Sequence, residues 1–265
     1  MKNLDIYCVT NKKIKFLEKT FLKLAGVGNQ SFTKEYLKCD HKNNIYYKEK
    51  YYSELTFHYW YWKNILPTEK KEWVGFCQKR RFWIKPDVNK SYISAENLNE
   101  FLLMGIDDKL NNYQSFICDP IKISGAKKIK IIKRGWKNLI KDPSIIFNHD
   151  KQTISLHFDM HHGYKNLDKA IQLLDKENKN DFLHYVKTKN HYNPHIMVIA
   201  RPYILEKWFN ELFTWLERCE EVFGFDKLRG YDTQRLYAYL AERYLSFWFK
   251  KHTKFKTNPW TFIDF

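Results

Sequence analysis

Two neighbouring arginines, Arg80 and Arg81, follow the short apolar run Trp73–Cys77. Because the run predicts a buried strand, the arginines are expected at its carboxyl end. Ligands of open α/β sheets bind beyond the carboxyl ends of strands, and a guanidinium fork matches phosphate oxygens bidentately. The next residues, Phe82 and Trp83, could stack on a base or shield the arginines from water. The pair therefore predicts a phosphate site, and a solvated basic turn is the alternative interpretation.

The segment from Ser53 to Asn64, SELTFHYWYWKN, is the second candidate. Ser53 can cap a helix, Glu54 suits its positive end, and Pro67 stops it. At about 100° per residue, Glu54 and Lys63 lie about 180° apart around this helix, so they would serve different parts of a cleft. Complementing the two ends of the helix dipole is the alternative role of this acid and base.

The third candidate is the segment HFDMHH, from His157 to His162. A strand is predicted at Thr153–Phe158, and if it continues, His157, Asp159 and His161 share one face. Two imidazoles and a carboxylate at this spacing could bind a transition metal, as in a metal-dependent hydrolase. Asp159 or His162 could instead act as a general base. An ordinary polar strand end is the remaining interpretation.

Positive charge is the dominant electrostatic feature of the chain. Its 46 Lys and Arg against 30 Asp and Glu give a formal net charge of +16, and residues 126–141 hold seven Lys and Arg with no acid. Such a chain attracts phosphate in nucleic acid, in an anionic membrane surface or in a phosphorylated substrate. Apolar residues make the segment 126–141 partly amphipathic, which suits a membrane surface or a polyanion, and a solvated basic face is the alternative.

Composition and missing motifs exclude several classes of protein. The 18% aromatic content is typical of a folded chain. No window approaches about 18 uncharged apolar residues, and the first residues lack the apolar core of a signal peptide. The five cysteines form neither a CxxC pair nor a zinc-ligand spacing, which indicates reduced thiols in a cytosol. Walker A, GxGxxG, GxSxG, HExxH and Asp-x-Asp are absent, so we expect neither a cofactor nor a metal.

An alternation of strands and helices must position these candidates. Strands are predicted at Leu4–Val9, Trp73–Cys77, Ser115–Cys118, Thr153–Phe158 and Ile196–Ala200, and short helices at Ala95–Met104 and Leu167–Leu174. Pro202 begins a helix that reaches about Phe223, and Asp232 caps another that ends near Lys251. The pattern predicts an α/β fold with a mainly parallel central sheet flanked by helices, in a single domain over residues 1–265 with a helical C-terminal layer.

Five segments agree in order and approximate spacing with one protein family. They are IYCVTNK from Ile6, YSELT with YWYWKN from Tyr52, GFCQKRRFW from Gly75, YNPHIM from Tyr192, and Gln234-Arg235 with AERYL from Ala241. In these segments the chain resembles a bacterial glycosyltransferase-like family, catalogued as a domain of unknown function, from capsule, lipooligosaccharide and O-antigen gene clusters. Residues 84–150 lie outside the match. Gln78 and Lys79 stand where the family prefers His and Tyr, so no proton-transfer role is carried over there.

The resemblance implies a transferase of the GT-A type that uses a nucleotide-sugar. Some relatives are linked to galactofuranosyl transfer from a UDP-sugar, which makes UDP the expected nucleotide. Residues 1–125 would form the nucleotide-binding half and residues 126–265 the acceptor half. The acceptor would be a growing saccharide on a lipid diphosphate carrier. The protein would then work in the cytoplasm, at the inner face of the cytoplasmic membrane.

Most of the expected site residues lie in the matching segments, whereas Asp159, His162 and Asp232 lie outside them and are assigned from their side-chain chemistry. Thr10 and Lys12 would bind the nucleotide, and Glu54 the nucleotide or sugar hydroxyls. Asp159 or His162 would take the proton of the acceptor hydroxyl, with Asp232 as a competitor. The complete set of expected substrate-binding residues is Thr10, Lys12, Glu54, Lys63, Arg80, Arg81, Asn193, Asp232 and Arg243.

Two other classes of function remain open. A non-catalytic nucleic-acid-binding protein agrees with the charge and the aromatic content, although the chain has no recognisable binding module. A metal-dependent hydrolase would use His157, Asp159 and His161. A steep salt dependence of nucleic-acid binding would favour the first alternative, and metal bound on purification the second.

From the missing Asp-x-Asp motif we predict that sugar transfer needs no added divalent cation. Lys and Arg would neutralise the leaving diphosphate in place of a metal. Transfer from a radiolabelled UDP-sugar should therefore proceed at the same rate in EDTA as in Mn²⁺. Activity that is lost in EDTA and restored by Mn²⁺ would contradict the prediction and would make Asp159 and its neighbouring histidines candidate metal ligands.

Overall fold

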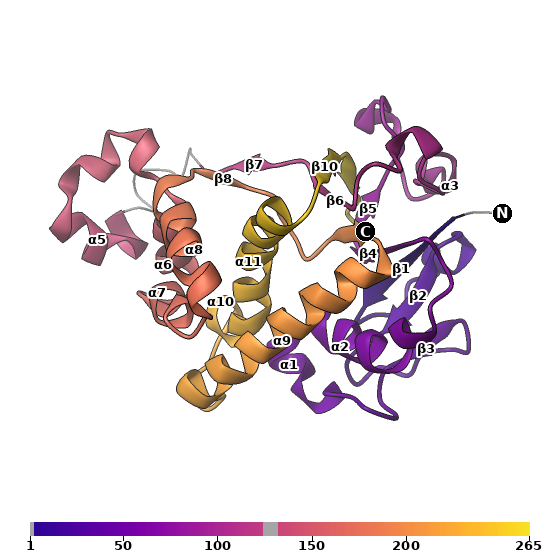
Figure 1. The fold of residues 1–265 in the computed structure, drawn as a ribbon, viewed down its shortest axis with the longest axis horizontal. Helices are drawn as coiled ribbons and strands as arrows, with labels where there is room; N and C mark the ends of the chain where they lie inside the picture. Colours follow the sequence, from indigo (N-terminus) through magenta and orange to yellow (C-terminus); the bar gives the residue numbers. More distant parts are fainter. Residues whose placement is uncertain (1–2, 124–131) are drawn as a thin grey trace. The chain divides into compact units, whose positions relative to one another are not determined.

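Strand β1 (Leu4–Thr10) lies inside the sheet that organises the first part of the protein (Figure 1). The protein is described by a computed structural model that covers residues 3–123 and 132–265. Residues 126–131 of the basic segment therefore lie outside the described residues. The chain divides into two compact units. Unit 1 comprises Met1–Asp119, His195–Glu211 and Trp248–Phe265, and unit 2 comprises Pro120–Pro194 and Leu212–Phe247.

The sheet of unit 1 has the strand order β10-β6-β9-β4-β1-β2-β3, with β5 and β11 joined beside β4. β1 pairs in parallel with β2 and β4, β2 with β3, and β6 with β10, whereas β9 is antiparallel to both of its neighbours. The predicted α/β fold with a mainly parallel central sheet is confirmed. The remaining strands are β2 (Lys23–Gly26), β3 (Tyr36–Lys38), β4 (Trp73–Gln78), β5 (Arg81–Trp83), β6 (Ser115–Cys118), β9 (Val198–Ala200), β10 (Phe255–Asn258) and β11 (Trp260–Phe262).

Close packing explains why β1 and β4 are nearly continuous apolar runs. Parallel strands buried on both faces have this pattern rather than strict alternation. Gly75 of β4 pairs with Ile6 on one side and Ile199 on the other, and a Cβ there would lie only 2.8 Å from Cγ1 of Ile199. The sheet therefore leaves no room for a side chain at position 75.

Helix α2 (Leu55–Asn64) covers one face of this sheet through aromatic side chains. The ring of Tyr7 on β1 lies 4.9 Å from the ring of Tyr61 and 5.6 Å from that of Phe57. Two short helices, α1 (Glu49–Tyr52) and α3 (Leu98–Phe101), complete the N-terminal part of unit 1. The predicted helix at Ala95–Met104 is thus shorter than expected.

Unit 2 is mainly helical. Its helices are α5 (Trp136–Lys141), α6 (Ile154–His162), α7 (Asn166–Ile171), α8 (Lys176–Thr188) and α10 (Tyr231–Gln234), with a small hairpin of β7 (Ile121–Lys122) and β8 (His191–Tyr192). The long helices α9 (Pro202–Phe223) and α11 (Leu236–His252) each contribute residues to both units, because the division falls inside them. Among the described residues, no helix is long and apolar enough to span a bilayer.

The predicted strand at Thr153–Phe158 is wrong, because this segment begins α6. Every second residue from Ile154 to His162 is buried, which imitates a half-buried strand. The helix instead has two apolar stripes at a spacing of four. Leu156 and Met160 pack against Ile145, and Phe158 contacts the ring of His162 on the other stripe. Two stripes on one helix therefore produce the false period of two.

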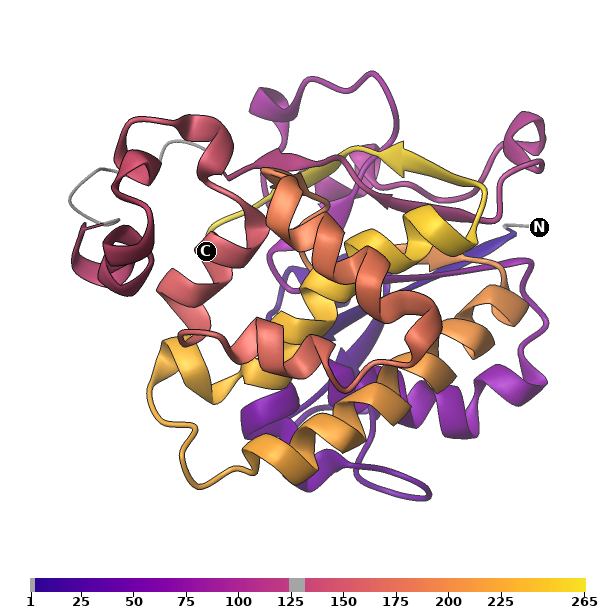
Figure 2. The ribbon, with the colours of Figure 1, turned by 60° about the vertical axis from the view of Figure 1, so that its left-hand side comes forward.

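Two predicted helix caps are also wrong. Asp232 lies inside the four-residue helix α10, where Gly230 occupies the N-cap position, and α11 begins only at Leu236. Ser53 makes no side-chain cap; its backbone has φ of 52°, and its carbonyl accepts from Thr56. The C-terminal layer is not wholly helical either. Figure 2 shows the yellow segment after α11 continuing as a strand, which pairs with β6.

His58 of α2 is a buried histidine whose pKa predicts acid sensitivity. Its ring lies 4.4 Å from the ring of Phe76 and 5.9 Å from that of Phe209, and its Nδ1 has no hydrogen-bond partner among the described residues. Burial lowers the pKa of His58 to about 3. The unfolded chain therefore binds a proton below about pH 6.5 that the folded chain rejects, so stability is lost as the pH falls.

We predict that His58→Phe makes unit 1 less sensitive to acid. Phenylalanine fills the same apolar site and has no proton to exchange. Between pH 7.5 and pH 5 the free energy of unfolding of the variant should gain about 2 kcal/mol on that of the wild type. Urea denaturation at the two pH values measures the difference. An equal loss of stability in both proteins would show that the pKa of His58 is the same in the folded and the unfolded chain.

Candidate active site

The parallel pairing of unit 1 brings four strand ends to one edge of the sheet, here called the carboxyl edge. Thr10 lies opposite Gly26, Gly26 opposite Lys38, and Val9 opposite Gln78. The loops after β1, β2, β3 and β4 therefore begin side by side. In open α/β sheets this edge is where ligands bind.

Gln78, at the end of β4, joins two of the predicted site residues. Its Nε2 donates to Oε1 of Glu54, which directly precedes α2. Its Oε1 accepts from a guanidinium nitrogen of Arg81 at 3.3 Å. Two hydrogen bonds thus link Glu54, Gln78 and Arg81 and hold a carboxylate and a guanidinium at the carboxyl edge. The sequence marked Gln78 only as a departure from the family motif and gave it no role, because its role depends on a partner 24 residues away in the sequence.

Thr10 and Lys12 lie in the loop after β1. The Thr10 hydroxyl donates to the carbonyl of Lys12 at 2.6 Å and accepts from its amide at 3.0 Å, so Thr10 shapes the loop. The side chain of Lys12 is exposed. Lys79 donates to the Asn11 side chain at 2.5 Å, which ties this loop to the end of β4. The structure therefore offers Lys12 and Lys79 as cations on this edge.

The two neighbouring arginines have different surroundings. Arg80 pairs with Asp264 at 3.2 Å and donates to the Phe265 carbonyl at 3.3 Å. Arg81 begins β5, lies 5.5 Å from the ring centre of Phe262, and reaches back to Gln78. Arg81 is therefore the better placed of the two for a ligand at the carboxyl edge. An exposed pair such as that of Arg80 contributes little stability.

Lys63 is not brought to this group. It lies near the other end of α2 from Glu54, about 13 Å along the axis at 1.5 Å per residue. Its ammonium rests 3.2 Å from the ring centre of Trp62. The expected separation of Glu54 and Lys63 is thus present in the helix.

Unit 2 contains a second polar group, around the buried residue Arg243. Arg243 is 1% exposed, pairs with Glu242, and lies 4.0 Å from the ring centre of Tyr192. One of its terminal nitrogens lies 3.3 Å from Nδ1 of His157. Removing such a charge from water is costly unless it is paired, which explains why so many polar groups gather here.

His162 and Asp232 belong to the same group. Nδ1 of His162 lies 2.9 Å from the carbonyl of Asp232, and its ring stacks on Tyr239 at 3.7 Å. The carboxylate of Asp232 pairs with Arg134 at 3.1 Å. Burial, and secondarily the charge of Arg243, lower the pKa of His162 to about 4. A carbonyl can only accept, so the neutral ring carries its proton on Nδ1 and leaves a lone pair on Nε2.

Asp159 lies apart from this group. Because α6 is a helix, residues 157 and 161 share a face, whereas residue 159 lies near the opposite one. The rings of His157 and His161 are 4.6 Å apart. Among the described residues, no three His, Cys, Asp or Glu side chains are grouped to hold a metal. The expected shared face of His157, Asp159 and His161 is therefore wrong.

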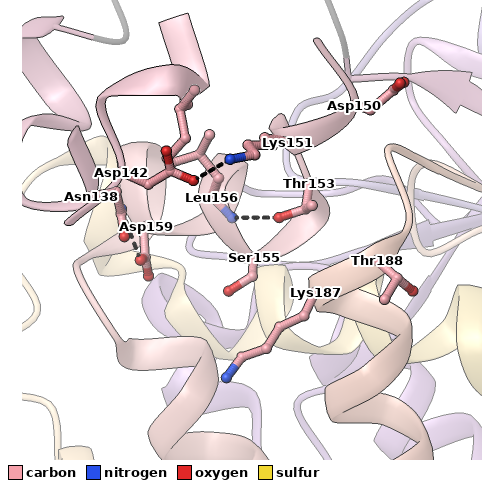
Figure 3. A pocket seen from close by; sticks show the side chains of 11 residues that line it. Asn138, Asp142, Asp150, Lys151, Thr153, Ser155, Leu156, Asp159, Lys187 and Thr188 are labelled. Atoms are coloured by element: carbon pink, nitrogen blue, oxygen red, sulfur yellow. Dashed lines mark hydrogen bonds and ion pairs between the residues drawn. The ribbon is translucent and has the colours of Figure 1, made fainter. Parts of the chain in front are cut away.

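A cavity of about 540 Å³ in unit 2 receives Asp159. Figure 3 shows Ser155 and Asp159 on the same side of α6, with Lys187 of α8 across the cavity. The Asp159 carboxylate accepts from the side chain of Asn138 at 3.1 Å and from the amide of Lys165 at 2.8 Å. Burial raises the pKa of Asp159 against these hydrogen bonds. Sequence reasoning missed Ser155 and Lys187, which have no motif to mark them.

Asn193 is fully buried and is used within unit 2. The side-chain oxygen of Asn193 accepts from the Ser246 hydroxyl at 2.8 Å, and the backbone N–H of Asn193 donates to the same hydroxyl at 3.0 Å. Tyr185 also contacts Ser246, at 2.9 Å. This network holds the end of β8 against α11.

A cavity of about 780 Å³ lies at the other end of the strands in unit 1. Asn3, Glu72, Asp107 and Asp108 are among its lining residues, and Asn3 and Glu72 directly precede β1 and β4. Three carboxylates make this cavity unsuitable for phosphate. The five cysteines are buried thiols, and burial raises the pKa of Cys39 to about 12, so it is not an activated nucleophile.

The fold and the polar strand ends define a mixed α/β protein whose sheet resembles that of a known glycosyltransferase. The chain is similar to the apo structure of the WbbM bifunctional glycosyltransferase, with a TM-score of 0.71 and 18% sequence identity. The match covers 99% of this chain and 45% of that chain, so the protein spans less than half the length of that structure. Residues 5–253 match the family described as "Domain of unknown function (DUF4422)", and the chain belongs to this family. No curated protein matches the chain.

The tautomer of His162 gives a direct test of the polar group in unit 2. We predict that the ring is neutral at pH 7 with its proton on Nδ1, and that it becomes charged only near pH 4. Long-range ¹H–¹⁵N spectra of the imidazole nitrogens measure both properties, and His161→Gln separates the neighbouring signals. A ring that titrates near pH 6.5 would place His162 in water instead of against Asp232.

Proposed function

We propose that the protein is a GT-A-type glycosyltransferase that moves a sugar from a UDP-sugar to a glycan acceptor. The proposed pathway is the synthesis of a bacterial surface polysaccharide, either capsule or lipooligosaccharide, on a lipid-linked acceptor. The WbbM structure is described as a bifunctional glycosyltransferase, and this chain covers 45% of it. The chain would thus correspond to one of two transferase activities.

The observation that carries the proposal is the pair of hydrogen bonds that links Glu54, Gln78 and Arg81 at the carboxyl edge. A nucleoside diphosphate needs cations near its phosphates. It also needs hydrogen-bond acceptors for the hydroxyls of its ribose and for the N–H groups of its base. Arg81 and Lys12 would supply the positive charge, with Arg80 as an outer cation. Glu54 would bind a hydroxyl of the nucleotide or of the sugar. Gln78 would keep the carboxylate of Glu54 from pairing directly with Arg81.

The reaction would place its largest new charge on the leaving diphosphate. The acceptor oxygen forms a bond with the anomeric carbon, and the bond from that carbon to the diphosphate oxygen breaks. UDP leaves with the bonding electrons, and the acceptor proton passes to a base. A guanidinium already in place stabilises the departing diphosphate without reorganisation.

Asp159 is the favoured base and His162 the second choice. Asp159 accepts a proton as a carboxylate and His162 as a neutral imidazole, and their surroundings in unit 2 differ. Asp159 faces a cavity, and its raised pKa makes it a stronger base than an ordinary aspartate. The pKa of His162 near 4 makes its free nitrogen a weak base, and the ring is buried. His162, Asp232 and Arg243 would then support the acceptor side through their shared polar group.

We predict that Arg81→Ala slows single-turnover transfer by roughly 10² to 10³, and weakens UDP binding in calorimetry, because a preorganised cation is lost. Arg80→Ala should have a smaller effect, because the Arg80 side chain is 40% exposed and already pairs with Asp264. Arg81→Lys should recover only part of the rate, since an ammonium cannot reproduce the bidentate fork.

Lys109→Ala is the control for these variants, since Lys109 is an exposed cation of unit 1 in the short turn Asp108–Leu110. Unchanged UDP affinity and rate in Arg80→Ala/Arg81→Ala would overturn the proposed donor site. Binding of nucleic acid that falls steeply with salt, together with no binding of UDP, would favour the nucleic-acid alternative.

A further inference from the structure

Residues 132–147 of unit 2 expose four large apolar side chains. Ile132 is 50% exposed, Trp136 52%, Ile140 72% and Phe147 76%. Trp136 and Ile140 are four residues apart in α5 and therefore share a face. Their neighbours point the other way, because Leu139 and Ile146 pack against the small apolar cluster that includes Leu156 and Met160. The exposure is thus confined to the outward side of this segment.

Basic side chains accompany these apolar ones. Lys133, Arg134, Lys137 and Lys141 are exposed, and residues 132–141 contain no acid. Arg134 pairs with Asp232, whereas Lys137 and Lys141 lie 5.1 Å and 5.5 Å from the ring centre of Tyr164. Lys137 also lies 5.5 Å from the ring centre of Trp136, so the lysines of α5 border its exposed apolar face.

We propose that this surface docks on an anionic lipid bilayer. It is called the interfacial patch, and it consists of Ile132, Lys133, Trp136, Lys137, Ile140, Lys141 and Phe147. Tryptophan and tyrosine favour the headgroup level of a membrane, and isoleucine and phenylalanine enter the acyl boundary below it. Lysine stems lie along apolar surface while their ammonium groups reach anionic headgroups.

A bilayer fits this patch better than a second copy of the chain or a nucleic acid. A two-fold interface would place the same patch on both subunits and would bring its lysines together, which costs free energy. A nucleic acid would use the lysines and stack on Trp136, but it has no partner for the exposed aliphatic chain of Ile140. Of these three partners, a lipid surface is the one that satisfies both the positive charge and the aliphatic groups.

The patch is independent of the donor site proposed for unit 1. The patch adjoins the cavity of unit 2, because residues of α5 contribute to both the patch and the cavity lining. Asn138 lines the cavity and Asp142 follows the helix into it, while Trp136 and Ile140 are exposed. A docked α5 would therefore hold the Asp159 cavity close to lipid headgroups, where a lipid-linked molecule would be presented.

Flotation of the full chain with lipid vesicles tests the proposal. The protein should float with vesicles of phosphatidylcholine containing 30% phosphatidylglycerol, chosen as about the anionic fraction of a cell membrane, and not with pure phosphatidylcholine. Lys137→Gln/Lys141→Gln should lower the partition roughly 30-fold, about fivefold for each charge removed near the surface. Trp136→Ser/Ile140→Ser should also abolish most flotation, because the two substitutions remove apolar groups from the surface. Since both side chains are exposed, their loss should leave the fold untouched.

Matched variants separate the patch from general charge and hydrophobicity. Lys169→Gln/Lys176→Gln removes two exposed lysines of unit 2 outside the patch, and Val222→Ser removes an apolar side chain that is 55% exposed. Both should float like the wild type. The proposal is overturned if these controls lose flotation equally, if only the lysine pair and not Trp136→Ser/Ile140→Ser matters, or if the patch variants change self-association in sedimentation instead. UDP calorimetry on the same variants should be unchanged, so failure of the patch is distinguishable from failure of the donor site.

Discussion

The parallel pairing of β1 with β2 and β4 is the constraint on which the candidate donor site depends. It sets Thr10 beside Gly26 and Val9 beside Gln78, so the following loops share one edge. Continuous apolar runs hold this register, because a slip by one residue would turn every buried side chain to the other face. At Gly75 even one added carbon would meet Ile199. The position of Glu54 and Arg81 is therefore a consequence of packing many residues away.

Unit 2 is organised by a different interaction, the burial of one guanidinium. Arg243 on α11 is compensated by Glu242, by the ring of Tyr192 on β8 and by His157 on α6. Its charge also helps to keep His162 neutral. The carboxyl group of Asp159 lies on the other side of α6, away from the charge of Arg243. There it faces a cavity and accepts two hydrogen bonds. One helix thus separates a buried polar group from an accessible one.

Elements with a strong local signal in the sequence were predicted more accurately than elements whose apolar pattern is narrow or depends on a distant partner. Strands β1, β4 and β6 and helix α9 were predicted close to their bounds, because long apolar runs and a proline at a helix start are local signals. Helix α6 was mistaken for a strand because two apolar stripes produced a period of two. The 13-residue helix α8 was missed, since its polar sequence has only a narrow apolar face. Strands β10 and β11 were missed because they become strands only by pairing with β6 and β5.

The sequence by itself determined the α/β class, the family resemblance, and the clustering of cations after β4 and in residues 133–141. Tertiary structure decided which of these groups face the same space. Arg80 and Arg81 are adjacent in the sequence, yet Arg80 pairs with Asp264 and Arg81 with Gln78. Arg80 lies in the turn between β4 and β5, whereas Arg81 is the first residue of β5, so the two side chains meet different parts of the chain. A partner more than 180 residues away leaves no local pattern, and for that reason the sequence could place both arginines at a strand end but could not tell them apart.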